Sequence, residues 1–286
     1  MTHVTRRQLL TRGWTDGRIR AAVGRGDLVR IRPGHFAESS LDIPTVRAIR
    51  VGGRLACVSA LRHHGIWVLD GDQIHVHVAG NAARLRTDGL NARVHWRPLV
   101  EPTASDSVGV VDALIQASGC LPHREWIASV DSAIHLGLLT ASGLAAISRS
   151  LPKRLRKTLR LVDGRAESGL ESIERVIAVE LGFRVRPQVR FAGVGRVDLV
   201  VENWVVIETD GTAFHDVSLA PRDRSRDARL AAAGRTVLRP GYSLVVYDQP
   251  AVARQLIGAV ASHRRIQDSG RIVARARKRA EKLGLA

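Results

Sequence analysis

The chain has little cysteine, little lysine and no long apolar run. Its two cysteines, Cys57 and Cys120, lie in apolar segments, where they provide neither a disulfide framework nor a familiar metal-ligand spacing. No stretch approaches the roughly 18 apolar residues of a membrane span. The first ten residues lack the apolar core of a signal peptide. These absences predict a cytoplasmic protein without a membrane segment.

Acidic residues are also scarce beside basic ones. The sequence holds 44 basic and 27 acidic side chains, which gives a formal net charge of +17. Lysine occurs only at positions 153, 157, 278 and 282, so the other 40 of the 44 basic residues are arginine. Coding bias of a genome can enlarge the arginine share, but the positive charge remains. Such charge predicts a polyanionic partner, with DNA as the first candidate.

Residues 5–37 have the pattern of two short helices followed by a β-hairpin. Thr5 can cap a helix over 6–12, and Thr15 or Asp16 can cap a second helix that runs to about Val23. The hairpin is expected over 28–36, with its turn at 33–34. Arginines accompany this pattern at positions 6, 7, 18, 20, 25, 30 and 32.

This pattern is typical of a winged helix-turn-helix and resembles the N-terminal domain of AbiEi-family antitoxins of type IV toxin–antitoxin systems. The resemblance implies DNA binding, and the residues assigned to it are Arg18, Arg20, Arg30 and Arg32. The alternative is a protein-docking domain of the same shape, with a cognate toxin as its partner.

Residues 41–150 continue this resemblance as a mixed α/β region. Helices are expected over 46–51, 59–64, 108–118 and 124–136, and strands over 74–78 and 93–96. His75 and His77 share one face of the first strand, with His63, His64 and His95 as further candidates for a zinc site. A half-exposed sheet face is the favoured interpretation, because no cysteine or acid stands at ligand spacing.

Carboxylates gather in a second hairpin, over 196–211. Two β-branched runs, 197–201 and 205–207, flank a polar turn, and the acids Asp198, Glu208 and Asp210 stand at the strand ends. Opposed hairpin residues have a constant sum of positions, so Asp198 faces Glu208 only if the loop has an odd length, such as 202–204. A two-residue loop would split the acids between the faces. The bland interpretation is a solvated strand end, and the functional one is a site for Mg²⁺, a cation that takes oxygen ligands.

The surroundings of this hairpin carry further motifs. They are Glu167-Ser-Gly-Leu-Glu171, Asp210-Gly211-x-x-Phe214-His215, Arg222-Asp223-x-x-Arg226-Asp227 and Gly234-x-x-Val237-Leu238-Arg239. Residues 160–262 together resemble the PD-(D/E)XK nuclease superfamily, in its Vsr-like branch. The resemblance implies a restriction-endonuclease-like α/β domain with a central mixed sheet and a Mg²⁺ or Mn²⁺ cofactor. Its implied metal ligands are Asp198, Glu208, the carbonyl of Thr209 and Glu171.

The other catalytic assignments follow from position or from the resemblance. Asp210 stands where the superfamily has its lysine, and it or His215 would position the attacking water. Arg222 and Arg226 would reach the scissile phosphate or brace the acids. On the expected helix 166–181, Glu167, Glu171 and Glu174 form one acidic edge, for which a solvated face is the simple alternative.

The sequence thus predicts a mixed α+β or α/β protein. The expected segments are a winged helix-turn-helix at 1–40, the mixed region at 41–150, a basic linker at 151–165, the nuclease-like domain at 166–262 and a basic C-terminal helix or tail at 263–286. The expected function is metal-dependent cleavage of DNA. The alternative is an AbiEi-like regulator or antitoxin with an inactive nuclease domain.

Overall fold

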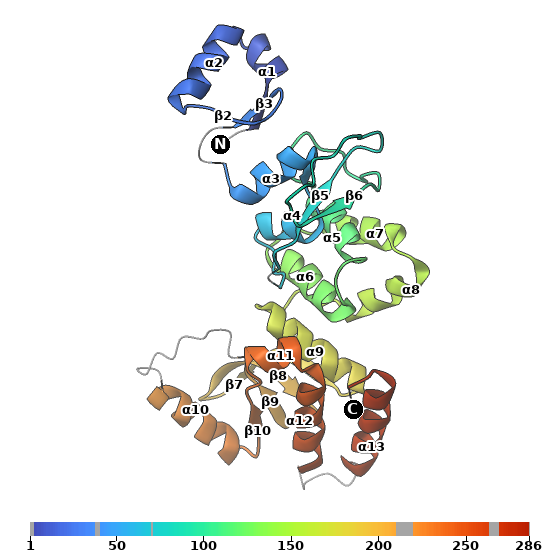
Figure 1. Ribbon diagram of the computed structural model, residues 1–286. Coiled ribbons are helices and arrows are strands. Elements are labelled where there is room, and N and C mark those ends of the chain that lie inside the picture. Colours follow the sequence, from blue (N-terminus) through green and yellow to red (C-terminus); the bar gives the residue numbers. More distant parts are fainter. Residues whose placement is uncertain (1–2, 38–40, 70, 210–219, 263–268, 286) are drawn as a thin grey trace. The chain divides into compact units, whose positions relative to one another are not determined.

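A computed structural model describes residues 3–37, 41–69, 71–209, 220–262 and 269–285, with the side chains of 220–225 and 269 left out. It is a mixed α+β structure with 13 α-helices, one 3₁₀ helix and three small sheets in the described residues. The chain forms two compact units, Met1–Leu121 with Leu139–Pro152, and Pro122–Leu138 with Lys153–Ala286 (Figure 1). The helix expected over 124–136 therefore lies in the second unit.

The first unit begins with a three-stranded sheet and two helices. Its elements are β1 (His3–Thr5), α1 (Arg6–Thr11), α2 (Asp16–Arg25), β2 (Val29–Arg32) and β3 (His35–Ala37), in the sheet order β1-β3-β2. The side chains of Thr5 and Thr15 cap α1 and α2, which confirms both expected helix starts. Gly26 ends α2 in the left-handed conformation, beyond the expected end at Val23. Strand β1 was not expected.

A small apolar core holds these elements together. Leu9 of α1, Ile19 of α2 and Phe36 of β3 are buried in one cluster with Val4, Ala22 and Leu28. The arginines of α2 therefore project from the side of the helix that this core leaves free.

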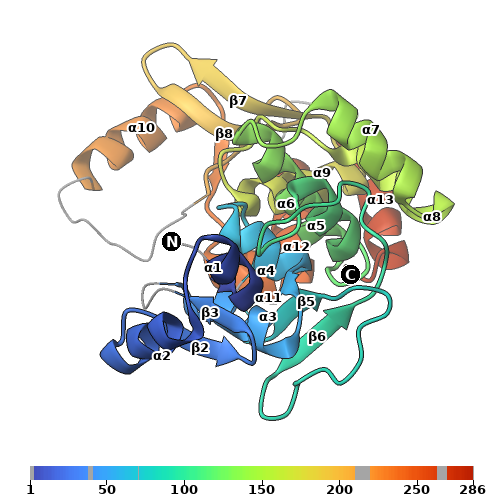
Figure 2. The ribbon, with the colours of Figure 1, turned by 90° about the horizontal axis from the view of Figure 1, so that it is seen from above.

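The rest of the first unit is a second three-stranded sheet with four helices. The elements are α3 (Ile43–Val51), β4 (Arg54–Leu55), α4 (Cys57–His63), β5 (Ile74–His77), β6 (Ala92–His95), α5 (Val110–Ala117) and α7 (Ala141–Ser150). Strand β5 pairs antiparallel with β4. It pairs parallel with β6, which lies beside it in Figure 2. His75 and His77 are both buried, so the expectation of a half-exposed sheet face is wrong for these two residues.

The second unit is built around a four-stranded mixed sheet. Its elements are α6 (His123–His135), α8 (Lys153–Arg156), η1 (Lys157–Leu161), α9 (Gly169–Leu181), β7 (Val185–Phe191), β8 (Gly195–Val201), β9 (Val205–Ile207), α10 (Ala220–Ala232), β10 (Thr236–Leu238), α11 (Tyr242–Tyr247), α12 (Gln249–Ser262) and α13 (Ser269–Lys282). The sheet order is β10-β9-β8-β7, antiparallel except for the parallel pair β9–β10.

Helices enclose this sheet. Helix α9 contacts β7 and β8 and packs against α6, α11, α12 and α13 (Figure 1). Its expected apolar stripe, from Leu170 to Leu181, is buried. Helix α10 contacts β10 and buries Leu230 against Val197 and Val206. The end of the hairpin β8–β9 therefore lies within reach of both α9 and α10.

The two basic segments are helical where the structure describes them. In the expected linker, residues 153–161 form α8 and η1, and Leu161 is buried. In the expected tail, α13 buries Val273, Ala276 and Ala280. None of the described helices is long and apolar enough to cross a membrane.

Candidate functional site

The register of the hairpin places Asp198 across from Glu208. Leu199 pairs with Ile207 and Val201 with Val205, so the positions sum to 406 as the odd-loop hypothesis requires. The three-residue loop 202–204 closes with the Trp204 N–H donating to the Val201 carbonyl at 3.2 Å. Asn203 has φ 70°, a left-handed conformation that asparagine tolerates better than most residues. The hairpin thus has the register that places the two acids on one face.

A third strand adds an amide to the two acids. Pro187 pairs with Leu199 and Val189 with Val197, which places Gln188 across from Asp198 on the other side. Gln188, Asp198 and Glu208 thus form a row across β7, β8 and the end of β9. The backbone of Gln188 has φ 54°, a conformation that costs a residue with a side chain about 1 kcal/mol or more.

Thr209, which follows β9, makes two hydrogen bonds to acids of the site. Its backbone N–H donates to Asp198 Oδ2 at 2.9 Å, and its hydroxyl donates to Glu174 Oε2 at 2.6 Å. Alternation along a strand turns Thr209 and Glu208 to opposite sides. The partners of the two residues differ, because the Thr209 hydroxyl meets Glu174 of α9 whereas the Glu208 carboxylate meets Arg226 of α10.

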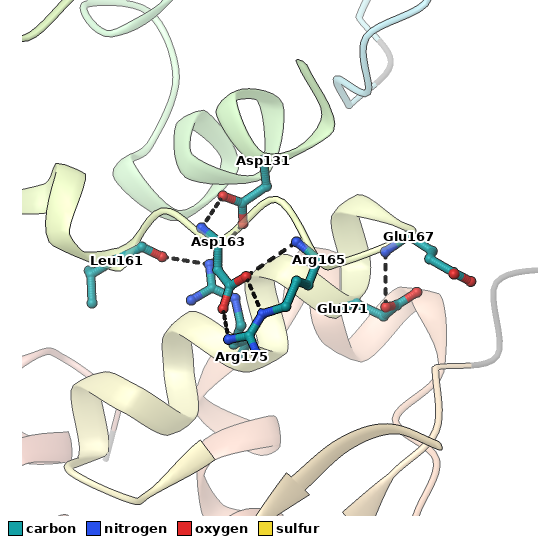
Figure 3. A network of polar contacts seen from close by, with 7 residues as sticks. All are labelled: Asp131, Leu161, Asp163, Arg165, Glu167, Glu171 and Arg175. Carbon is teal, nitrogen blue, oxygen red and sulfur yellow. Dashed lines mark hydrogen bonds and ion pairs between the residues drawn. The ribbon is translucent and has the colours of Figure 1, made fainter. Parts of the chain in front are cut away.

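The acidic edge of α9 is buried, not solvated. Glu171 is 6% exposed and Glu174 0%, so the solvated-face alternative is wrong for both; Glu167 remains exposed. Ser168 caps the helix by accepting from the Glu171 N–H. Glu171 Oε2 accepts from the Glu167 N–H at 3.1 Å (Figure 3) and from Gln188 Nε2 at 2.9 Å. Glu171 therefore joins the row through Gln188.

Two arginines hold Glu208. Arg226 Nη2 lies 2.9 Å from Oε1, and Arg239 Nη2 lies 3.4 Å from Oε2, while the Glu208 side chain is only 12% exposed. Arg239 also forms a two-pronged contact with Asp227. Of the two arginines assigned to this region, Arg226 is thus placed at the acids.

The carboxylates of the site influence one another. Burial raises the pKa of Glu171, the Glu167 N–H opposes that rise, and Asp198 adds to it. Burial likewise raises the pKa of Glu208; Arg226 and Arg239 oppose the rise, and Asp198 adds to it. Asp198 therefore repels acids on two different elements, α9 and the end of β9.

The donor set suits a hard cation in its chemistry but is not yet gathered around one point. Gln188 Oε1 is buried without a hydrogen-bond partner, and an amide oxygen is a ligand that Mg²⁺ or Mn²⁺ accepts. Among the described residues, however, the one group whose ligand atoms all lie within 4.8 Å of each other is Cys57, His75, His95 and Cys120, in the first unit. The Glu208 carboxylate is paired with Arg226 and Arg239.

Neither a scan against protein-family models nor a search of curated proteins returns a match for this chain. The site must therefore be interpreted from its own residues.

Three assigned residues cannot be placed. Asp210 and His215 lie outside the described residues, and so does the side chain of Arg222. Their catalytic and DNA-contacting roles stay predictions.

The N-terminal arginines divide into two kinds. Arg18, Arg20 and Arg30 are exposed, and the Arg18 guanidinium lies 4.2 Å from the centre of the Trp14 ring. Arg32 is half-buried, its Nε has no hydrogen-bond partner, and burial followed by repulsion from Arg86 lowers its pKa. Arg32 is thus less available to a ligand than the other three.

Sequence reasoning missed Gln188 and Arg239 as members of the site. Gln188 gives no signal by itself, because a polar residue in a strand is common, and only the pairing of β7 with β8 places it beside Asp198. Arg239 ended one of the motifs around the hairpin but was given no role there; in the structure it directly follows β10, the strand that pairs with β9.

Proposed function

We propose that the chain is a DNA-binding protein whose second unit hydrolyses DNA phosphodiesters with a divalent metal, as the resemblance to Vsr-like PD-(D/E)XK nucleases implies. The observation that carries this proposal is the row of Gln188, Asp198 and Glu208 with Glu171 beside it. Burial raises the pKa of both glutamates, and repulsion from Asp198 adds to the rise, so their ionised forms are destabilised at this place. Such an arrangement is typical of a functional site. The four-stranded mixed sheet is consistent with the implied fold.

The metal in this proposal is Mg²⁺ or Mn²⁺, held by Asp198, Glu208, Glu171 and the carbonyl of Thr209. When bound, the cation lowers the pKa of a coordinated water and offsets the charge that develops on the phosphate oxygens. Gln188 adds an uncommitted buried oxygen to this donor set.

Arg226 and Arg239 have two tasks in this scheme. Without DNA they balance the charge of Glu208, which is only 12% exposed. A guanidinium also binds phosphate oxygens with two parallel hydrogen bonds. Once Glu208 takes part in metal binding, Arg226 keeps its hydrogen bond to the Arg196 carbonyl and exchanges its contact with Glu208 for a phosphate of the substrate.

The DNA-binding part of the proposal rests on charge. The net charge of +17 and the exposed Arg18, Arg20 and Arg30 on α2 and β2 provide a basic surface for phosphates. Sequence readout, where present, would come from α2 in the major groove, as a winged helix-turn-helix implies.

A second candidate function is that of an AbiEi-like regulator or antitoxin whose nuclease unit only binds DNA. It is favoured by the pairing of both Glu208 oxygens with arginine, which balances the carboxylate without any cation. The acid at position 210, where the superfamily has lysine, favours it as well.

Plasmid cleavage distinguishes the two functions. Supercoiled plasmid is incubated with the purified full chain in Mg²⁺, in Mn²⁺ and in EDTA, beside Asp198→Ala and Glu208→Gln. Glu281→Gln is the matched control, because it removes an exposed carboxylate far along the chain from the hairpin. Metal-dependent nicking that both site variants lose and the control keeps supports the nuclease. DNA binding without nicking supports the regulator, and nicking that survives Glu208→Gln contradicts the assignment of the site.

A further inference from the structure

Four potential metal ligands meet in the first unit, far along the chain from one another. They are Cys57 at the start of α4, His75 on β5, His95 at the end of β6 and Cys120 after α5. One ligand atom from each lies within 4.8 Å of all the others. His75 Nδ1 and His95 Nε2 are 3.0 Å apart, and both cysteines are free thiols.

The cluster is enclosed. Cys57 is 0% exposed and His75 5%, while His95 and Cys120 are half-buried. Its neighbours along the chain, Ala56 and Val76, are fully buried and apolar. Enclosure of this kind protects bound metal from water and from competing ligands.

The backbone around the cluster is fixed by hydrogen bonds from several elements. The Cys57 N–H donates to Gln116 Oε1 of α5 at 2.9 Å, and the His75 N–H donates to Ser59 Oγ of α4 at 2.9 Å. The His75 carbonyl in turn accepts from the Ala56 N–H. Cys57 itself has φ 50°, which an ordinary side chain rarely adopts. These contacts hold the Cys57 side chain toward β5 and α5.

We propose that Cys57, His75, His95 and Cys120 bind one structural Zn²⁺ ion. Two thiolates and two imidazoles are the donor set of closed, four-coordinate zinc sites, whereas Mg²⁺ prefers oxygen. The ion cross-links α4, β5, β6 and the segment after α5. It is independent of the acids in the second unit and supplies stability to the first unit rather than catalysis.

The site has a spacing that sequence motifs do not cover. The ligands stand at positions 57, 75, 95 and 120, so successive ligands are 18, 20 and 25 positions apart. Zinc-finger patterns place ligands in pairs with two to five residues between them. The strand that carries His75 also carries His77, but His77 is not among the four.

Metal content tests the proposal directly. The full chain is produced without a histidine tag, under reducing conditions, and its metals are measured by mass spectrometry. We expect about one zinc per chain, because four protein ligands close the coordination sphere. Cys120→Ser should weaken zinc affinity at least about tenfold, measured by competition with a chromogenic chelator, since even loss of a group that orients a ligand costs 10- to 100-fold in affinity. The matched control is His63→Gln, an exposed histidine on the same helix as Cys57, which should keep full occupancy.

Cobalt provides a second readout that does not depend on how the variants fold. Co²⁺ added to metal-free wild type should give a sulfur-to-cobalt charge-transfer band and the intense visible bands of tetrahedral coordination. Chelation should lower the thermal unfolding midpoint of the wild type and leave that of folded Cys120→Ser unchanged. Wild type that is isolated without zinc and gives no cobalt–sulfur band overturns the proposal. A Cys57–Cys120 disulfide in the reduced preparation does so as well.

Discussion

Arg175 and Asp131 form an ion pair in the interior of the second unit. Arg175 Nη2 lies 2.8 Å from Asp131 Oδ2, and the two side chains are 6% and 0% exposed. Arg175 also donates to the Leu161 carbonyl, and Asp131 Oδ1 accepts from the Asp163 N–H (Figure 3). The pair therefore ties α9, which carries Glu171, to α6 and to the segment that precedes α9.

Removal of one partner should destabilise the second unit strongly. At pH 7, where Asp131 is ionised, Asp131→Ala leaves the Arg175 guanidinium buried without its counter-charge, and we expect a loss of about 3–5 kcal/mol in the free energy of unfolding. Chemical denaturation of the full chain measures it. The control is Arg254→Ala, which breaks the exposed pair with Asp248 and should cost less than about 1 kcal/mol. Equal losses in the two variants would show that the buried pair has no special role.

Because the Asp131 carboxyl titrates with a shifted pKa, we expect the stability of the protein to depend on pH. Burial raises the pKa of Asp131 from 3.8 to about 6, although Arg175 opposes the rise. Because the pKa of Asp131 is higher in the folded state than in the unfolded state, the folded state holds this proton more tightly. The contribution of Asp131 to the free energy of unfolding is therefore full below pH 3.8 and is lost as pH rises through about 6. At 1.36 kcal/mol per pKa unit, the loss is up to about 3 kcal/mol.

Asp131→Asn isolates this contribution, because asparagine keeps the size of the side chain and does not titrate. The difference in unfolding free energy between wild type and Asp131→Asn should fall from pH 4.5 to pH 7. A difference that stays constant over this range, or that rises, contradicts the raised pKa.

Local signals were sufficient for part of this structure. The caps at Thr5 and Thr15 depend on residues within one helical turn. For the hairpin, parity reduced the register to two alternatives, and the structure has the one with a loop of odd length. Short polar loops and caps involve few residues, so sequence alone constrains them.

The remaining features of the two sites depend on contacts between residues far apart in the sequence. Glu171 has the helical spacing of a solvated edge, and its burial depends on Gln188 of β7. Cys57 and Cys120 have no ligand spacing along the chain, and only the packing of α4 and α5 beside β5 and β6 brings them to His75. Such contacts connect residues far apart in sequence, and no local pattern encodes them.

Arginine variants should separate DNA contact from structure in the first unit. Neutralising the exposed Arg18, Arg20 and Arg30 together should weaken DNA binding and flatten its salt dependence, by roughly 0.9 units of slope for each phosphate that is no longer neutralised. Binding measured at several salt concentrations gives this slope. The free energy of unfolding should change little, because these side chains are exposed.

Arg32→Gln is the matched control for these variants. Arg32 is half-buried and burial lowers its pKa, so its replacement should alter the stability of the first unit more than the salt slope. If Arg32→Gln flattened the slope as much as the exposed variants do, the exposed surface would not be the phosphate-binding one.

Glu208→Gln tests how much the contacts of Glu208 stabilise the protein when no metal is bound. The change leaves Arg226 and Arg239 without a charge that they now contact, so it should destabilise the metal-free protein. The thermal unfolding midpoint in EDTA measures this effect. An unchanged midpoint would mean that the two arginines contribute no net stability at this position.

Asp198→Asn should have the opposite effect in EDTA. Asparagine can still accept the Thr209 N–H, while removal of the charge ends the repulsion that raises the pKa of Glu171 and Glu208. The metal-free variant should therefore unfold at the same temperature as wild type or higher. Mg²⁺ should raise the midpoint of wild type as its concentration passes the dissociation constant, and the variant should lose this response, because binding to the folded state alone produces it. A gain of stability together with loss of the Mg²⁺ response is the trade-off expected of a functional acid. An equal Mg²⁺ response in both proteins would place the cation elsewhere and remove the basis for a nuclease site at this hairpin.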